Sequence, residues 1–478
     1  MNKLNSIILN TDSYKCGMYK MYPPGTEYVY SYIESRGGEY AETEFLGVQA
    51  LAKYLAEPIT QEQIDYADKI WTAHGEPFNK DGWQYILDKH NGRLPIRIRA
   101  AREGLIIPTK NVLCTIENTD PNCFWLTTWV ETAALRAIWY PTTVGTISWN
   151  IKQFILKYLE KSGDPSTIAF KLHDFGARGV SSMDSAGIGG AAHLVNFMGT
   201  DTISGVLHVM DTYGGDVAGF SIPAAEHSTI TSWGRENEVD AYRNMVKQFG
   251  GNGNILAVVS DSYDIYNACK LWGTELKDEV IASGATVVIR PDSGDPIIVL
   301  SKMLLILEKF YGAPKNAKGY KVLNNVRVIW GDGINIQSLE SILSHMVDYL
   351  GYSADNFAFG MGGGLLQQLN RDTLKFAMKA SAIGIRENIP ASWNPDVVIP
   401  ELVWRDVFKD PITDPGKASK KGRVTLWESG GEYYSSVTQP KGWVDKGLQW
   451  KEAMETYFED GEVKFTQTFD QVRENSNA

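Results

Sequence analysis

The sequence predicts an α/β protein in which parallel βαβ units are joined to a mixed α+β layer. Two observations support this prediction. Between about residues 165 and 385, short β-branched runs recur, each followed by a helical pattern, and polar residues gather just after the runs. Outside that stretch, helical windows and alternating segments are mixed. The chain has 478 residues, which is enough for about two domains.

The first 145 or so residues combine helix and strand signals. The opening segment 1–9 predicts a buried first strand. Residues 47–71 have the apolar spacing of helices, and residues 93–108 alternate as strands do. A helix rich in aromatic residues begins near Cys123, and Pro141 predicts its end. These elements together predict the α+β layer.

Seven segments in the middle of the chain are short and apolar, and most of them are rich in β-branched residues. They are residues 167–172, 202–209, 254–262, 285–292, 326–333, 356–363 and 374–380. Strands that alternate with helices form parallel sheets, and the carboxyl ends of such strands meet at one edge. We therefore expect a functional site where these segments end. The tail from about residue 395 carries a basic stretch and then alternating segments, which predicts a return to the first layer.

Composition excludes several classes of protein. Lys and Arg total 46 against 57 Asp and Glu, a net charge of −11, so nucleic acid or an anionic membrane is not expected as the main partner. The net negative charge is still compatible with a small anionic ligand held in a local basic pocket. The four cysteines are scattered without a metal-binding spacing, which predicts reduced thiols and a cytoplasmic protein. No apolar stretch approaches the roughly 18 residues of a membrane helix.

A glycine-rich segment, GMGGG, begins at Gly360 and runs into a helical pattern. Gly362 and Gly363 would let backbone N–H groups approach a phosphate closely. Glycine clusters at strand ends are more often simple turns, and this one matches neither the dinucleotide fingerprint nor the P-loop.

Cationic side chains strengthen the phosphate hypothesis. Arg178, Arg290 and Arg371 lie in or beside strand-end loops of an acidic protein, and Lys379 follows. Guanidinium groups match the geometry of phosphate oxygens, whereas a single such arginine would more often be a surface ion-pair partner. Together these residues favour a polyanionic ligand.

Carboxylates and a histidine complete the set of candidates. Asp292 and Asp332 would bind ribose hydroxyls or Mg²⁺, although capping helices or pairing with the arginines would also explain them. Asp201 lies just before a helical pattern, and capping that helix would be enough to explain it. His227, in PAAEHS, is on its own more simply a buried core histidine.

These motifs carry a resemblance to a known family. NTDSYKCGMYK, HDFGARGVSS, SIPAAEHS, VSDSYD, VIRPDSGDP, VIWGDG and FGMGGG occur in the order found in nicotinamide phosphoribosyltransferases, and the similarity spans residues 7 to about 430. The resemblance implies an irregular, incomplete β/α barrel of the type II phosphoribosyltransferase kind, formed by residues 165–390. It also implies a second α+β domain from both termini, residues 1–150 and 395–478, which contributes to a dimer interface and the active-site rim.

The resemblance implies a reaction in NAD salvage. Nicotinamide and phosphoribosyl pyrophosphate would give nicotinamide mononucleotide and pyrophosphate, with Mg²⁺ as cofactor and ATP as a coupled substrate. The enzyme would be a homodimer with shared active sites, and the residues do not identify the Mg²⁺ ligands. Nicotinate phosphoribosyltransferase is the nearest alternative. A non-catalytic binding protein and a nicotinamide-dependent oxidoreductase are further alternatives, but no dinucleotide fingerprint is present.

The resemblance also assigns residues. The pyridine would be bound by Phe175, Arg178, Asp201, Arg290 and, from the partner subunit, Tyr14. Ribose and phosphates would be bound by Asp292, Gly331, Asp332, Gly362, Gly363, Arg371, Lys379, Lys409, Lys417 and the partner's Arg36. The catalytic set would be His227, Asp261, Arg290 and Asp292, with His227 phosphorylated by ATP and hydrogen-bonded to Asp261. The sequence departs from the family pattern at Ala177, Met361 and Ala377.

Overall fold

The chain divides into two compact units in a computed structural model that describes residues 6–392, 394–440 and 449–477. The first unit comprises residues 1–146, 211–215 and 370–478, and the second comprises residues 147–210 and 216–369. Each unit has its own main β-sheet. Over these residues, no helix is both long and apolar enough to cross a membrane.

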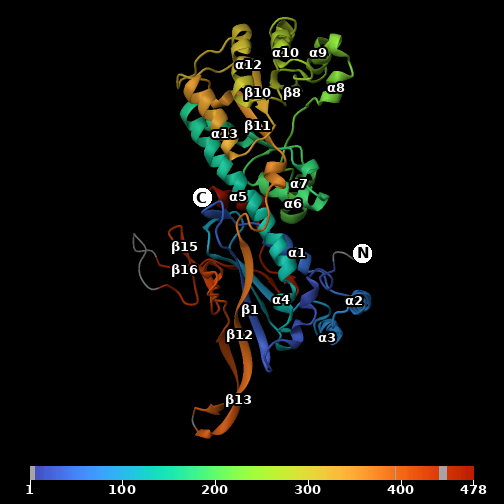
Figure 1. Cartoon of the computed structure of the whole chain (residues 1–478), viewed down its shortest axis with the longest axis vertical. Coiled ribbons are helices and arrows are strands. Elements are labelled where there is room, and N and C mark those ends of the chain that lie inside the picture. The colour runs from blue at the N-terminus through green and yellow to red at the C-terminus, as the bar shows by residue number, and fades with distance from the viewer. Residues whose placement is uncertain (1–5, 393, 441–448, 478) are drawn as a thin grey trace. The chain divides into compact units, whose positions relative to one another are not determined.

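A seven-stranded antiparallel sheet is the framework of the first unit. Strand β1 (Thr26–Ser35) lies between β12 (Phe376–Ala391) and β5 (Val112–Asn118), so strands from both ends of the chain are neighbours. β12 continues into β13 (Asn394–Asp406), which forms the long hairpin of Figure 1. The remaining strands are β3 (Ile96–Ala100), β17 (Glu455–Glu459) and β18 (Glu462–Val463).

Helices and two small sheets complete this unit. The helices are α1 (Val48–Leu55), α2 (Gln61–His74), α3 (Lys80–His90), α4 (Leu126–Trp129), the first half of α5 (Glu131–Ser162) and α15 (Phe469–Ser476). The small sheets are β2 (Glu42–Glu44) with β4 (Ile106–Pro108), and β14 (Thr425–Ser429) with β15 (Glu432–Ser436) and β16 (Lys451–Glu452).

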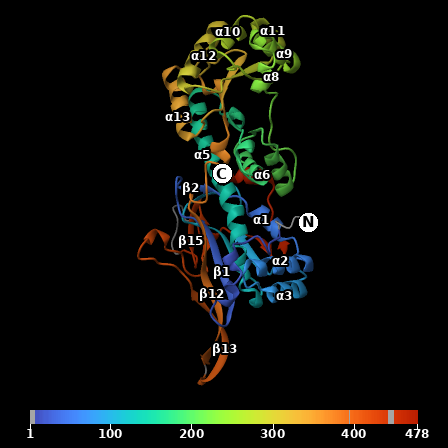
Figure 2. The ribbon, with the colours of Figure 1, turned by 45° about the vertical axis from the view of Figure 1, so that its right-hand side comes forward.

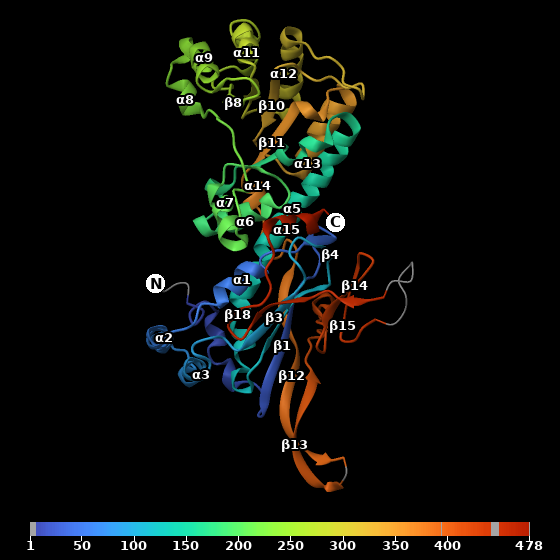
Figure 3. The same cartoon turned by 180° about the vertical axis from the view of Figure 1, so that it is seen from behind.

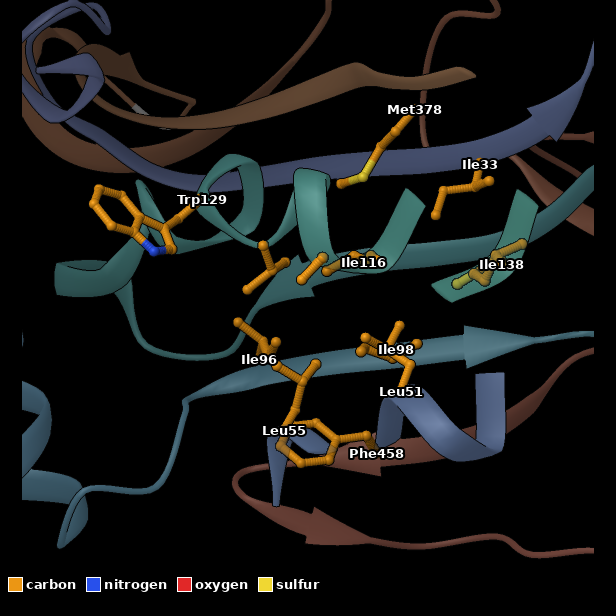
Figure 4. Close-up of a cluster of buried hydrophobic side chains, with 14 of the residues drawn as sticks. Ile33, Leu51, Leu55, Ile96, Ile98, Ile116, Trp129, Ile138, Met378 and Phe458 are labelled. Carbon is orange, nitrogen blue, oxygen red and sulfur yellow. The ribbon is translucent and has the colours of Figure 1, made fainter. Parts of the chain in front are cut away.

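The core of the first unit lies between its antiparallel sheet and its helices (Figure 4). Ile98 and Ile116 from the sheet face Leu51 of α1 and Ile138 of α5, and all four are fully or almost fully buried. Burial of apolar side chains such as these contributes about 1.5–3 kcal/mol each. The alternating pattern of 93–108 is confirmed by β3 and β4, and the helical pattern of 47–71 by α1 and α2.

The expected helix end at Pro141 is wrong, because α5 continues through this residue to Ser162. Proline removes the N–H group that would bond the carbonyl four residues earlier, here Ala137. Gly47 has a φ of 100°, and a Cβ atom there would lie only 2.0 Å from the Ala137 oxygen, so its backbone packs directly against that carbonyl. Thr142 further joins the two segments, since its Oγ1 accepts from the Leu46 N–H group at 3.1 Å.

A curled parallel sheet of six strands is the framework of the second unit. In spatial order the strands are β7 (Gly199–Thr200), β6 (Leu172–Asp174), β11 (Phe357–Met361), β10 (Val326–Trp330), β9 (Thr286–Arg290) and β8 (Ile255–Val259). A closing segment, Phe220–Ala225, bridges the two edges: Phe220 pairs with Gly199 of β7, and Ala224 pairs with Ala257 of β8. The expected β/α half-barrel with a second domain from both termini is therefore confirmed.

Small apolar residues line the inner face of this curled sheet. Ala257, Val288 and Ile329 form a buried cluster, against which Phe175 and Ile222 pack. Helices cover the outer face, where α9 contacts β8 and α12 contacts β10. Figure 2 shows α9, α10, α11 and α12 grouped in this part of the second unit.

The helices of the second unit begin with the second half of α5. The others are α6 (Met183–Leu194), α7 (Ile203–Tyr213, which ends in the first unit), α8 (His227–Thr231), α9 (Glu238–Phe249), α10 (Ile265–Gly273), α11 (Lys277–Ser283), α12 (Pro296–Tyr311), α13 (Ile336–Leu343) and α14 (Gly363–Leu366). Figure 3 shows α6, α7 and α14 close together. α6 and α7 pack at backbone contact, because a Cβ atom on Gly205 would lie 2.8 Å from Gly190.

Four strand predictions need correction. Residues 202–209 are helical, and the strand there is the short β7 that precedes them. Residues 167–172 mostly form a 3₁₀ turn, with β6 starting at Leu172. Residues 374–380 contribute to β12 of the antiparallel sheet rather than to the parallel sheet. In the opening segment, residues 1–5 lie outside the described part, whereas Ile7 and Ile8 are buried in a turn.

Candidate active site

Polar and glycine residues follow all six parallel strands at their carboxyl ends. They are Phe175–Arg178 after β6, Asp201 after β7, Asp261 after β8, Asp292 after β9, Gly331–Asp332 after β10, and Gly362–Gly363 after β11. Because all six strands are parallel, these residues lie along one edge of the sheet. The structure thus brings together the members of the predicted site that belong to the second unit.

The Phe175 ring lies against two glycines of neighbouring strands. A Cβ atom on Gly360 would lie 1.9 Å from the ring, and one on Gly331 would lie 3.6 Å from it, so glycine is required at position 360. The Phe175 N–H group donates to the Met361 carbonyl at 2.9 Å, which fixes the start of the turn. One face of a half-buried aromatic ring is therefore held at the carboxyl end of the sheet.

Asp201 lies on the other side of β6, between β7 and α7. Its carboxylate is exposed and accepts a hydrogen bond from Ser221 Oγ of the closing segment at 2.5 Å. Its backbone N–H group donates to the Asp174 carbonyl at 3.0 Å. Arg178, in the turn after Phe175, is also exposed. The sequence carried no signal for Ser221, because an isolated serine in a loop has many explanations.

His227 and Asp261 form a hydrogen-bonded pair, with His227 Nε2 3.0 Å from Asp261 Oδ1. The other oxygen of Asp261 accepts from Asp292 N–H at 2.8 Å and Ser293 Oγ at 2.6 Å. Burial favours the neutral carboxyl, but these hydrogen bonds outweigh it and lower the pKa of Asp261. The imidazole is 44% exposed, so His227 is not the buried core histidine that its sequence context alone favours.

Arg290 is the last residue of β9, and Asp292 lies on the loop that follows, whose backbone and Ser293 side chain bond to Asp261. The Arg290 guanidinium lies 3.9 Å from the Asp292 carboxylate, too far for a good hydrogen bond. Arg290 Nε is buried and has no hydrogen-bond partner in the described residues. After β10, Asp332 is exposed, and its backbone carbonyl accepts from the Trp330 indole at 2.6 Å. The edge therefore offers one arginine and two carboxylates with capacity for a ligand.

The glycine turn after β11 is open. Gly362 precedes α14, and a Cβ atom on Gly363 would meet nothing within 4 Å. Met361 is buried, so the expected departure from the family pattern at this position fills protein interior. Ala177, the second departure, is exposed in the turn beside Arg178. Ala377, the third, is buried in β12 of the first unit.

The remaining predicted residues belong to the first unit. Tyr14 is 62% exposed, next to Lys15, which is buried and paired with Glu131 at 2.6 Å. Arg36 pairs with Glu34 through Nε at 3.0 Å, while its Nη2 atom is buried without a partner in the described residues. These side chains are held by the start of α5 and by β1.

The predicted site residues of the first unit also include four cations, Arg371, Lys379, Lys409 and Lys417. Burial, together with the nearby cations Arg36, Arg371 and Lys15, lowers the pKa of Lys379 even though Glu131 opposes the shift. Arg371 donates to the Phe376 carbonyl at 3.0 Å. Lys409 and Lys417 are exposed on the loop after β13. Arg371 lies 3.2 Å from Asp372 and Lys417 lies 3.3 Å from Asp414, so both have acidic neighbours. A concentration of cations is nevertheless a feature of sites for polyanions.

In the described part of the chain, no group of three or more His, Cys, Asp or Glu side chains is placed to hold a metal ion. Mg²⁺ keeps several waters and is commonly bound by one or two carboxylates plus substrate phosphates, so such a group is not required. Asp292 and Asp332 provide carboxylates of this kind at adjacent strand ends, and an Asp292 oxygen lies 3.8 Å from where a Cβ atom on Gly331 would be.

Comparisons with known proteins agree with this geometry. A model of the nicotinate phosphoribosyltransferase family matches residues 170–462, and a model of the nicotinamide phosphoribosyltransferase N-terminal domain matches residues 6–98. A nicotinamide phosphoribosyltransferase of Xanthomonas campestris is 52% identical over 100% of this chain and 99% of its own. The enzyme of that name from Mycoplasma pneumoniae is 32% identical over 87% of this chain and 94% of its own.

Solved structures share the fold at low identity. The nicotinate-nucleotide pyrophosphorylase of Pyrococcus furiosus has a TM-score of 0.61 at 15% identity, covering 100% of this chain and 96% of its own. Human nicotinic acid phosphoribosyltransferase has a TM-score of 0.54 at 13% identity, covering 98% and 92%. The chain belongs to the nicotinate phosphoribosyltransferase family of pentosyltransferases, and relatives similar to it along almost their whole length are named nicotinamide phosphoribosyltransferases.

Proposed function

We propose that the chain transfers the phosphoribosyl group of phosphoribosyl pyrophosphate to nicotinamide, giving nicotinamide mononucleotide and pyrophosphate for NAD salvage. The observation that carries the choice of substrate is the exposed Asp201 carboxylate at the sheet edge that also holds Phe175. The full-length relatives named nicotinamide phosphoribosyltransferases support the same choice.

Asp201 would discriminate between the two pyridines by charge. A carboxylate accepts a hydrogen bond from the amide NH₂ of nicotinamide but repels the carboxylate of nicotinate. Two like charges about 4 Å apart cost at most ~4 kcal/mol at an effective dielectric constant near 20. The Ser221 hydrogen bond would hold the Asp201 carboxylate in place. Nicotinate is therefore the disfavoured substrate.

The pyridine ring would stack on Phe175, with the partner subunit's Tyr14 on its other face and with Arg290 and Arg178 near the carboxamide. This sharing of the site requires a homodimer. The exposed Tyr14 ring and the buried Lys15–Glu131 pair next to it are suited to such a role, because they present an aromatic group on a fixed turn. Stacking would hold the ring nitrogen in line with the anomeric carbon.

Charge stabilisation would supply most of the catalysis. The bond from the anomeric carbon to pyrophosphate breaks largely before the pyridine nitrogen bonds, which leaves positive charge on the ribose and negative charge on the leaving group. Asp292 and Asp332 would bind the ribose. The 5′-phosphate and the part of the ribose beside it would be contacted by Gly331, Gly362, Gly363 and Arg371. Lys379, Lys409, Lys417 and the partner's Arg36 would bind the leaving phosphates. No general base is needed, because the pyridine nitrogen already has a lone pair.

Bound Mg²⁺ would neutralise pyrophosphate charge, with Asp292 and Asp332 as its protein ligands. Arg290, whose Nε has no partner in the described residues and whose guanidinium lies 3.9 Å from the Asp292 carboxylate, fits a site that receives both a cation and an anionic substrate.

ATP hydrolysis would be coupled to transfer through His227. One ring nitrogen faces Asp261, so the other would attack the γ-phosphorus as the bond to ADP breaks, and water would later hydrolyse the phosphohistidine. The ionised Asp261 would fix the tautomer and stabilise the positive charge that develops on the ring. His227 is half-exposed, as a phosphoryl acceptor must be.

Product analysis tests the proposal. Protein mixed with nicotinamide, phosphoribosyl pyrophosphate and Mg²⁺ should form the mononucleotide, and more of it when ATP is present. Parallel reactions with nicotinate should be much slower. Equal turnover of both pyridines would favour the alternative specificity, and no product with either would leave a non-catalytic binding protein as the better description.

A further inference from the structure

A second aspartate, Asp174, lies directly beneath the turn that carries Phe175. It is the last residue of β6 and pairs with β7 on one side and β11 on the other. Its side chain is completely buried, although aspartate is among the residues least often found in protein interiors. The reaction described above assigns it no part.

Asp174 bonds to both flanks of the pyridine site. Its Oδ1 atom accepts from the Gly176 N–H group at 2.7 Å, inside the turn that leads from Phe175 to Arg178. Its backbone carbonyl accepts from the Asp201 N–H group at 3.0 Å. One residue thus links the aromatic turn after β6 to the carboxylate loop after β7.

The other carboxylate oxygen is enclosed by small groups. A Cβ atom on Gly190 of α6 would lie 3.3 Å from Asp174 Oδ2, so this helix packs closely over it. Asp174 Oδ2 and Thr202 Oγ1 are both buried, and the Thr202 hydroxyl is a neighbouring group that favours the ionised carboxylate. Leu366 of α14 covers Gly176 from above. The carboxylate is therefore enclosed by protein, and the backbone hydrogen bond that it accepts is the one from the turn.

Burial raises the pKa of Asp174 to about 6. The Gly176 N–H group and the Thr202 hydroxyl oppose this shift, and the nearby Asp201 carboxylate adds to it. Burying an ionisable group has a cost that alanine would avoid. The cost is explained if the hydrogen bond to the turn is what the position supplies.

We propose that Asp174 is a positioning residue for pyridine binding, which holds the Phe175–Arg178 turn through Gly176. This inference rests on the proposed function, because it assigns Phe175 to the pyridine. Asp174 touches no substrate, so its loss should weaken binding of the pyridine while leaving binding of the sugar phosphate unchanged.

Three variants test the role: D174A removes the acceptor, D174N keeps an amide oxygen for Gly176, and N356A is the matched control. Asn356 is equally buried and also accepts a backbone N–H bond, from Leu323 at 2.8 Å, but it lies at the opposite end of β11. Steady-state kinetics give the KM for nicotinamide and for phosphoribosyl pyrophosphate. Hydrogen exchange by mass spectrometry on peptides covering 174–179 reports on the turn independently of activity.

We expect D174A to raise the KM for nicotinamide about 10-fold, with the KM for phosphoribosyl pyrophosphate unchanged and faster exchange at 174–179. D174N should restore both readouts, and N356A should alter neither. Faster exchange with an unchanged nicotinamide KM, or equal effects on both substrates, would show that Asp174 is merely structural. If D174A does not fold, a D174N protein with raised nicotinamide KM overturns the role. Wild-type protein that forms no mononucleotide overturns the proposed function, and the role of Asp174 with it.

Discussion

Two clusters of polar residues in this protein differ in how completely their groups are paired. In the first unit, the fully buried Glu103 accepts hydrogen bonds from Gln49 N–H at 3.0 Å and Tyr213 Oη at 2.6 Å. Its carbonyl accepts from Gln467 and Asn475 at the end of the chain. At the sheet edge of the second unit, most carboxylates are at least partly exposed and have one partner or none.

This difference separates structural from functional polar groups. Buried polar groups that satisfy one another hold segments together, and around Glu103 they join α1, the end of α7 and the C-terminal segment. Groups that have no hydrogen-bond partner within the described residues, such as Arg290 Nε, can bond to a ligand. Substitutions in the Glu103 cluster should therefore change stability, and substitutions at the sheet edge should change chemistry.

The strongest test of the functional side is His227→Ala. Without the phosphoryl acceptor, ATP hydrolysis should fall about 1,000-fold or more, while slow, uncoupled transfer to nicotinamide remains. Because the imidazole is half-exposed, the free energy of unfolding should change by less than about 1 kcal/mol. ADP release and chemical denaturation measure the two effects. Normal ATP turnover by this variant would rule out the phosphohistidine.

The strongest test of the structural side is Glu103→Ala. Removal of the carboxylate leaves the Gln49 N–H and Tyr213 hydroxyl groups buried without this acceptor, which should lower the free energy of unfolding by about 3 kcal/mol. Transfer by the remaining folded protein should keep its nicotinamide KM. Glu462→Ala is the control, since loss of this solvent-exposed ion pair should lower the free energy of unfolding far less. Equal losses in the two variants would contradict the comparison.

Asp201→Ser should change specificity by a smaller factor. Loss of the negative charge should raise the nicotinate-to-nicotinamide ratio of kcat/KM about 10- to 100-fold. Asp216→Ser makes the same replacement at an exposed loop position of the second unit and should leave the ratio unaltered. An unchanged ratio in the Asp201 variant would mean that another group selects the pyridine.

Asp174→Asn gives the smallest expected effect, and its pH dependence is distinctive. The folded carboxyl has a pKa of about 6, above its ordinary value, so between about pH 4 and pH 6 the folded state binds a proton that the unfolded chain does not. The variant avoids burying a charge and should be more stable than wild type by roughly 1–2 kcal/mol above about pH 7. This advantage should shrink as the pH falls through 6 toward 4. Urea unfolding of both proteins across this range measures it, and a pH-independent difference would mean that Asp174 titrates normally.

The sequence predicted the sheet edge well because its strands are apolar runs that end abruptly in polar residues. β8, β9, β10 and β11 all follow this pattern. Residues 202–209 have the same composition, but Ile203, Val206 and Met210 follow helical spacing, and the strand beside them has only two residues. Short strands cannot be recognised by alternation, since their pairing is set by neighbours far away in the sequence.

Pairings between residues far apart in the chain were the other feature that could not be predicted from the sequence. Residues 374–380 were recognisable as a strand, but nothing in them indicates pairing with β1 rather than with the parallel sheet. Pro141 wrongly predicted a helix end, because the helix accommodates this proline through contacts of Gly47 and Thr142, which the local sequence does not indicate. Ser221 and Ser293 support Asp201 and Asp261 through single hydroxyl groups, which leave no pattern in a sequence. The residues proposed to bind substrate were identified from sequence motifs. The residues that position those side chains were identified only from the structure.

The order of strands in the antiparallel sheet has a consequence for how the protein is made. Ser35, at the end of β1, bonds to Leu374, which lies 339 residues further along the chain. A ribosome adds about 5–20 residues per second, so β1 waits for its β12 neighbour for roughly 20–70 s. During synthesis β1 is an unpaired edge, and such edges promote aggregation. We expect chains truncated before β12 to depend on chaperones, even though they contain every strand of the parallel sheet.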